Sequence, residues 1–203
     1  EWDAELISAF ANQCAVAIDN AFLHDSLQKS YHQTLQALVN TIEAKDSYTM
    51  GHTARVSKYA VGTGRAYPLD DARVERLKLA ADLHDIGKIG IREGIINKAG
   101  KLSDTEFVSI KDHVIMGEKI LQPITYLRDI LPHVRSHHEK WDGSGYPDGL
   151  KGEEIPLEGR ILAIADAFDA MTSQRSYNKP LSYEEALERI KEVSGKHFDP
   201  EVV

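Results

Sequence analysis

Residues 137–147 have the sequence HHEKWDGSGYP, in which two adjacent histidines precede a turn that contains two glycines, an aromatic residue and a proline. Neighbouring residues leave an α-helix about 100° apart, so the rings of His137 and His138 can reach one metal ion only near a helix end. Gly143 and Gly145 allow a sharp backbone turn and leave room for a ligand. A polar surface turn after a helix explains these residues equally well, so the rest of the chain must decide.

Length and composition describe an ordinary globular protein. The 203 residues suit one domain with a sizeable core, or one domain with an appendage, and they are 42% hydrophobic and 28% charged. The formal charge of −8 argues against a general nucleic-acid binder, because nonspecific phosphate contact needs a basic face. We therefore expect no DNA partner. A phosphate substrate held by metal ions and a few well-placed cations is not excluded.

The sequence also bears on where the protein resides. No stretch approaches the roughly 20 apolar residues of a membrane span, and no signal peptide is visible. The single cysteine, Cys14, excludes an intramolecular disulfide and favours a cytoplasmic protein. The first residue is not methionine, which predicts that the chain is a fragment of a longer protein.

Residues 1–45 are expected to form one long helix, because they contain no proline or glycine and are rich in alanine, leucine, glutamine and lysine. In the second half an apolar stripe follows helical spacing, with Leu23, Leu27, Tyr31, Leu38 and Ile42. A helix this long is hard to bury against one small domain. We therefore predict a connector that pairs with a second copy of itself, the alternative being a helix packed on its own domain.

Beyond Asp46 the sequence predicts shorter helices and long loops, and no run alternates with period two, so the expected fold is all-α. Ser103 and Ser182 are plausible helix starts, and Ser182 with Glu185 has the capping-box pattern. The glycine-rich, charged segments 89–103 and 141–158 are expected to be loops. The predicted helices cover residues 50–66, 70–88, 104–122, 126–140, 159–173 and 182–194.

The motif HDIGK at residues 84–88 closes the predicted helix 70–88 and begins with His84 and Asp85. Imidazole and carboxylate are ligands that divalent transition metals favour, and one carboxylate can bridge two ions. Lys88 lies one helical turn after His84 and would project to the same side if the helix persists. A cation there could hold a phosphate oxygen. A buried salt bridge between Asp85 and Lys88 is the plain structural alternative.

Further candidate ligands fall on separate predicted helices: His52, His113 and Asp166. Asp166 interrupts the apolar run ILAIADAF at residues 161–168, and a carboxylate in such a helix is costly to bury unless it is paired or bound to metal. Structural pairing is the alternative, but metal ligation is favoured by the neighbouring motifs.

Together these residues resemble the HD-GYP family, a branch of the metal-dependent HD phosphohydrolases. The resemblance covers about residues 33–203 and runs through KDSYTMGH (45–52), HDIGK (84–88), His113, the 137–147 stretch, residues 166–177 and Phe198-Asp199-Pro200. Residues 1–22 resemble the last helix of a GAF sensor domain. We therefore predict an HD-type helical bundle at 33–203, preceded by a GAF-terminal connector helix at 1–32 that forms a coiled coil.

The resemblance implies a function and a site. Family members hydrolyse cyclic di-GMP to pGpG and often on to GMP. The implied cofactor is two divalent ions, iron or manganese, whose bridging hydroxide attacks phosphorus in line. Asp85 would bridge the ions, Lys88 and Arg175 would contact phosphate, and Tyr146 would help to form the guanine pocket. The implied metal ligands are His84, Asp85, His113, His137, His138 and Asp166.

Two departures from the family pattern affect these expectations. Some members bind a third metal through a glutamate one turn before the histidine that corresponds to His52, and this chain has Tyr48 there. We therefore expect two ions, with His52 a nearby polar group or a weak ligand. After Tyr177 the family often has a basic residue, where this chain has Asn178 and then Lys179. Phosphate is then held less tightly, or Lys179 reaches it from another angle.

Alternatives to the cyclic di-GMP phosphodiesterase stay open. An HD phosphodiesterase acting on another nucleotide keeps the fold and changes the substrate. A catalytically weak module could bind the dinucleotide without cutting it, although the complete ligand set argues against this. The expected partners are cyclic di-GMP, an upstream GAF sensor domain, a second copy paired through helix 1–45, and GGDEF-domain proteins.

Overall fold

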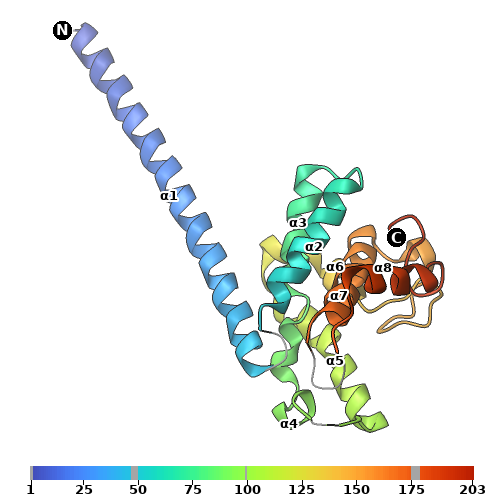
Figure 1. The fold of residues 1–203 in the computed structure, drawn as a ribbon. Coiled ribbons are helices and arrows are strands. Elements are labelled where there is room, and N and C mark those ends of the chain that lie inside the picture. Colours follow the sequence, from blue (N-terminus) through green and yellow to red (C-terminus); the bar gives the residue numbers. More distant parts are fainter. Residues whose placement is uncertain (1, 47–49, 99, 175–178) are drawn as a thin grey trace. The chain divides into compact units, whose positions relative to one another are not determined.

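The computed structural model describes residues 2–46, 50–98, 100–174 and 179–203 (Figure 1). Within these ranges the chain consists of helices and loops without a β-strand, and one isolated bridge joins Ser194 to Phe198. The predicted all-α fold is confirmed. Residues 1–40 and 41–203 form two compact units.

Most of the first unit belongs to α1 (Trp2–Lys45), a continuous helix of 44 residues. Its bounds agree with the predicted helix 1–45. Large apolar side chains along it are exposed to solvent, including Phe10, Phe22, Leu23 and Leu27. An exposed apolar side chain gains nothing from the hydrophobic effect until another surface covers it.

By length and composition alone, α1 could also cross a membrane. This is weak evidence, because Asn12, Gln13, Asp19 and Asn20 interrupt its apolar sequence and polar groups are costly inside a bilayer. The expectations of no membrane span and of a cytoplasmic location stay predictions.

The second unit is a bundle of short helices joined by long loops. In this bundle α2 packs against α3 and α7, α5 against α6, α6 against α7, and α7 against α8. Val56, Leu77, Leu121 and Leu162 are fully buried and come from four different helices, so the core is shared by the whole bundle. The α-helices are α2 (His52–Ala66), α3 (Asp71–Leu83), α4 (Glu93–Ile96), α5 (Asp104–Leu121), α6 (Leu131–Ser136), α7 (Leu157–Thr172) and α8 (Tyr183–Glu192), with 3-10 helices η1 (Ile86–Gly90), η2 (Thr125–Ile130) and η3 (Gly152–Glu154).

Side-chain caps set several helix starts. Ser103 and Ser182 each accept a hydrogen bond from the backbone three residues later, and the glutamate there bonds back, which confirms both predicted starts. Asp70 caps α3 by accepting from the backbone N–H of Arg73.

Two predicted helices were too long. The helix expected over 70–88 ends at Leu83 and continues as η1, and the helix expected over 126–140 consists of η2 and α6, which ends at Ser136. A tight approach between η1 and α5 explains the first difference. A Cβ atom on Gly87 would overlap the backbone carbonyl of His113, so this glycine lets the two backbones touch.

We expect Gly87→Ala to lower the free energy of unfolding by about 3 kcal/mol, the upper end for overpacking, because the added methyl meets backbone atoms and no rotamer relieves the overlap. The matched control is Gly94→Ala in α4, where a Cβ meets nothing within 4 Å. That variant should stay within about 0.5 kcal/mol of the parent. Equal denaturation midpoints for the two variants in urea would contradict the close approach.

Candidate metal centre

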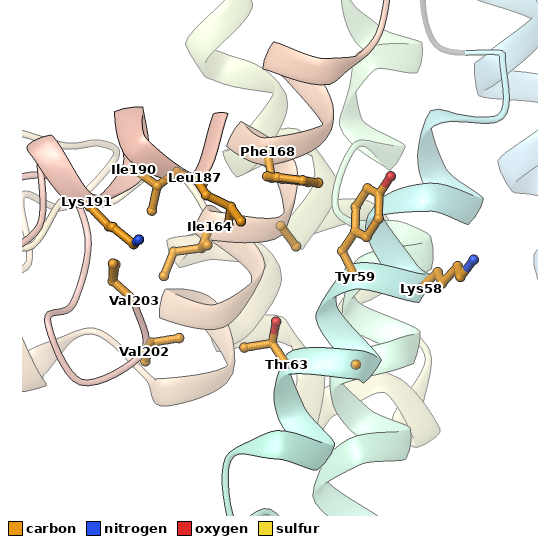
Figure 2. A pocket seen from close by; sticks show the side chains of 12 residues that line it. Lys58, Tyr59, Thr63, Ile164, Phe168, Leu187, Ile190, Lys191, Val202 and Val203 are labelled. Atoms are coloured by element: carbon orange, nitrogen blue, oxygen red, sulfur yellow. The ribbon is translucent and has the colours of Figure 1, made fainter. Parts of the chain in front are cut away.

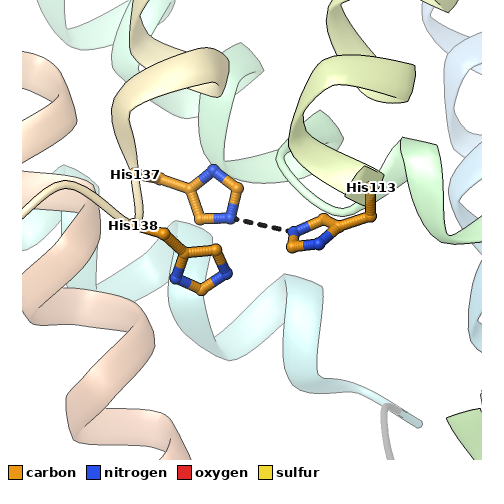
Figure 3. Close-up of side chains that lie close together, drawn as sticks. All are labelled: His113, His137 and His138. Carbon is orange, nitrogen blue, oxygen red and sulfur yellow. Dashed lines mark hydrogen bonds between the residues drawn. The ribbon is translucent and has the colours of Figure 1, made fainter. Parts of the chain in front are cut away.

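Three histidine rings converge at the junction of α5 and α6 (Figure 3). His113 comes from the middle of α5, and His137 and His138 follow the last residue of α6. Each offers a ring nitrogen, and these three atoms lie within 4.8 Å of one another. Because α6 ends at Ser136, the rings of His137 and His138 can both face His113, as expected for adjacent histidines near a helix end.

Hydrogen bonds to the backbone fix the direction of three rings. The Nδ1 atoms of His84, His113 and His137 lie 2.7, 2.6 and 2.6 Å from the carbonyl oxygens of the residues three places earlier. A carbonyl oxygen can only accept, so each Nδ1 carries a proton, and Nε2 presents a lone pair wherever the ring is neutral. In metal sites a ligand histidine usually donates the N–H of its other ring nitrogen to a protein acceptor, and this bond fixes the direction of the ring.

The Nε2 lone pairs of His113 and His137 face each other without a hydrogen-bond donor between them. The Nε2 atoms of His113 and His137 lie 3.4 Å apart, and with both Nδ1 atoms protonated neither can donate to the other. A buried acceptor without a donor is costly, and a cation would satisfy it. The buried Nε2 of His84 also has no hydrogen-bond partner among the described residues. Burial lowers the pKa of His84, but the carboxylate of Asp85, 3.4 Å from that nitrogen, outweighs burial and raises it.

Asp85 lies between this group and a second one. His52, His84 and Asp85 again offer ligand atoms within 4.8 Å of one another. One carboxylate oxygen of Asp85 is 3.4 Å from Nε2 of His84, and the other is 3.5 Å from Nε2 of His113. The two oxygens therefore face different histidines, which is the arrangement a bridging carboxylate needs.

Asp166 reaches the same region from α7. Its Oδ1 lies 3.3 Å from Nε2 of His52, and its side chain is largely buried. Burial would raise the pKa of this carboxyl, but His52, His84 and His138 lower it, so Asp166 is ionised. The structure thus brings together His84, Asp85, His113, His137, His138, Asp166 and His52.

The electrostatics fit a divalent cation. Burial lowers the pKa of His137 and of His113, and it lowers that of His138 to about 4, so these rings are neutral as metal ligation requires. Burial would raise the pKa of Asp85, but Lys88 and His84 hold it well below its usual range. Neutral imidazoles and ionised carboxylates are the ligand types that such ions prefer.

A family model described as an HD domain matches residues 36–202. The chain belongs to the HD-domain family. Among curated relatives, the "3'3'-cGAMP-specific phosphodiesterase 2" of Vibrio cholerae is 36% identical over 100% of this chain and 39% of its own length. The "Cyclic di-GMP phosphodiesterase" of Thermotoga maritima is 43% identical over 84% of this chain and 47% of its own length. The chain spans less than half the length of either relative.

Solved structures agree on the fold. Bd1817, an HDG"Y"P protein of Bdellovibrio bacteriovorus, superposes with a TM-score of 0.62 at 19% identity, covering 83% of this chain and 60% of that one. V-cGAP3 of V. cholerae gives a TM-score of 0.61 at 23% identity, covering 83% and 46%. The predicted HD-type bundle is confirmed.

Lys88 adds a fixed cation to the cluster of candidate ligands in this HD domain. Its ammonium lies 2.8 Å from Asp85 and 3.0 Å from Asp46. Burial lowers its pKa, but these two carboxylates outweigh burial and raise it, so the side chain is charged. The α-helix expected through residue 88 ends earlier, yet Lys88 reaches Asp85 because η1 turns it back toward that carboxylate. Lys45 supports this turn by donating to the carbonyl of Ile91 at 2.6 Å.

Asp169 was missed in the sequence. It is buried, and its carboxylate accepts from Nδ1 of His52 at 2.7 Å and from Nε of Arg55 at 2.5 Å. Burial lowers the pKa of His52, but hydrogen bonds to Asp166 and Asp169 outweigh it and raise the pKa to about 9. A signal was present, because Asp169 follows Asp166 by three residues on one helix and therefore shares its face.

The loop after His138 is organised by another carboxylate that sequence reasoning missed. Glu139 is buried and accepts backbone hydrogen bonds from Asp148, Gly149 and Leu150 at 2.7, 3.1 and 3.1 Å. Tyr146 donates its backbone N–H to the carbonyl of His138 and places its ring 4.9 Å from that imidazole. The loop therefore folds back over the ligand cluster.

Some predicted residues cannot be placed at this site. Arg175, Tyr48 and Asn178 lie outside the described residues. Lys179 is described and is exposed to solvent in the segment before α8.

A separate hollow of about 380 Å³ lies in the bundle, where α2, α7 and α8 meet (Figure 2). Its described lining contains no histidine, aspartate or glutamate side chain, so it lacks the candidate ligands gathered at Asp85. Figure 2 shows Tyr59, Ile164 and Phe168 around the cavity and Lys191 at its edge.

We expect Glu139→Gln to destabilise the domain by about 1–3 kcal/mol, because an amide has only one carbonyl oxygen to accept what two carboxylate oxygens accept now. Hydrogen exchange should become faster at the amides of residues 148–150. Glu153→Gln, at an exposed position in the same loop, is the matched control and should leave exchange unchanged. Unaltered protection at 148–150 in Glu139→Gln would contradict the role assigned to this carboxylate.

Proposed function

We propose that residues 33–203 form the HD-GYP catalytic domain of a metal-dependent phosphodiesterase that hydrolyses cyclic di-GMP to pGpG and on to GMP. The observation that carries the proposal is the convergence of His84, His113, His137 and Asp166 around the carboxylate of Asp85. The curated relatives named as cyclic di-GMP phosphodiesterases support the choice of substrate.

Two divalent ions, iron or manganese, are the proposed cofactor, with Asp85 shared between them. When bound, such ions lower the pKa of water and neutralise charge on phosphate oxygens. The proposed ligands are the six residues predicted from the sequence, with His52 as an additional ligand. The Nε2 lone pairs of His113 and His137, which neither ring can satisfy for the other, support this set, since each would gain a bond to a cation.

The chain's own cations act on the phosphate in this proposal. Lys88 stays charged beside Asp85. Its ammonium can therefore leave one of its carboxylate partners, contact a phosphate oxygen of the substrate, and stabilise the negative charge that develops there during hydrolysis. Asp46 keeps that ammonium in place, because it contacts Lys88 from the end of α1. Arg175 and Lys179 are proposed to hold phosphate from the segment before α8, and Tyr146 to contact a guanine base.

A second candidate substrate is 3'3'-cGAMP, because a relative that aligns with the whole chain is named for it. The phosphodiester chemistry is the same in both dinucleotides, so the metal centre cannot separate them. A binding module that does not cut would hold either ligand and release no product, and product analysis on metal-loaded protein tests for it.

We expect Asp85→Asn to lose bound metal and at least about a hundredfold of cyclic di-GMP turnover, because one carboxylate serves both proposed ions. Elemental analysis of the purified variant and a chromatographic product assay measure the two effects. Asp112→Asn, exposed on α5, is the matched control and should keep both. Full turnover by Asp85→Asn would contradict the proposed site.

Residues 1–32 are proposed to be the end of a GAF sensor domain and a connector, with α1 pairing to α1 of a second copy. The exposed Leu23 and Leu27 support this, because they lie one turn apart on one face of the helix. A change in this pairing would alter access to the metal centre. GGDEF-domain proteins are proposed as further partners on the resemblance alone.

We expect Leu27→Lys to shift the protein from dimer to monomer in sedimentation velocity at micromolar concentration, because it places a charge in the proposed seam. Gln28→Lys adds the same charge to an exposed neighbouring position outside the stripe and should leave the dimer intact. A parent protein that is monomeric at all concentrations would contradict the pairing.

A further inference from the structure

Beside the proposed metal ligands, α5 holds a cation between two aromatic rings. The ammonium of Lys111 lies 4.8 Å from the ring centroid of Phe107 and 4.8 Å from that of Tyr146. A cation above an aromatic face is attracted by the ring's electron density. Among the described residues the ammonium of Lys111 makes no ion pair with a carboxylate. The rings of Phe107 and Tyr146 are the partners that the structure shows for it.

These side chains form a continuous row that ends at the metal centre. The ring of Tyr146 lies 4.9 Å from the ring of His138, which belongs to the three-histidine group. At the other end Phe107 is 49% exposed, so this end of the row reaches solvent. Aromatic faces stack nucleic-acid bases without regard to base identity. The row can therefore hold a base next to the ligands, and its only charged member is Lys111.

We infer that Lys111 selects guanine over adenine for the base that lies against Tyr146. The inference rests on the proposed function and concerns the same site. A base stacked on Tyr146 competes for the face over which the ammonium now lies. The flexible lysine can then move to the edge of the base, where it meets the ring's polar atoms.

The edges of the two purines differ in a way that a lysine can distinguish. Guanine presents two acceptors, O6 and N7, and lysine or arginine pairs with both. Adenine presents the N7 acceptor beside an N6 amino donor, which repels an ammonium. A residue that only supported the Tyr146 ring would affect both bases alike, so the ratio of guanine to adenine substrates identifies the role.

The test compares kcat/KM for cyclic di-GMP and cyclic di-AMP in metal-loaded protein. We expect Lys111→Met to reduce the preference for cyclic di-GMP on the order of tenfold, the size of one base-edge contact. Lys111→Arg should retain the preference, because a guanidinium pairs with the same two acceptors. Lys119→Met, exposed on the same helix, is the matched control and should behave as the parent.

The outcomes separate this inference from the proposed function. If the parent cuts cyclic di-GMP and Lys111→Met loses activity equally on both substrates, or loses none, the inference is overturned while the function stands. If the parent cuts no dinucleotide, the proposed function fails, and calorimetric titration of the same ligands decides the inference. A lower preference of Lys111→Met for binding cyclic di-GMP supports it, and an unchanged preference or no binding overturns it.

Discussion

The site depends on the contacts that the carboxylate of Asp85 makes with the side chains around it. It is buried, and its two oxygens face His84 and His113 while Lys88 lies against it. Asp46, Asp166 and Asp169 add further carboxylates in contact with this region, and the described cations that meet them are Lys88, Arg55 and the protonated ring of His52. So many buried carboxylates in one place are costly unless cations are bound. Packing therefore builds a place that favours divalent metal.

Short-range geometry makes the arrangement rigid. Three of the histidines are fixed by hydrogen bonds to carbonyl groups one turn earlier, so each helix orients its own ligand. Gly87 lets η1 touch α5, which brings His84 and Asp85 against His113. Glu139 then folds the following loop back over His138. The proposed base row of Phe107, Lys111 and Tyr146 uses the same two elements, α5 and that loop, so the proposed substrate specificity and metal binding would share one scaffold.

Much of this could be predicted from local sequence. The adjacent His137 and His138 required a helix end, and Asp166 was conspicuous as a carboxylate within an apolar run. Asp169 and Lys111 were missed because their roles depend on partners more than thirty residues away in the sequence. The break in the predicted helix 70–88 was missed for the same reason, since contact with α5 and not local propensity ends α3. The boundary between connector and catalytic domain stays a prediction.

The most direct test is a crystal structure of anaerobically prepared protein with anomalous data collected at the iron and manganese edges. We expect two metal peaks, one on each side of Asp85, with the Nε2 atoms of His84, His113 and His137 directed toward them. A fully ordered cluster without metal after loading, or metal bound away from Asp85, would contradict it.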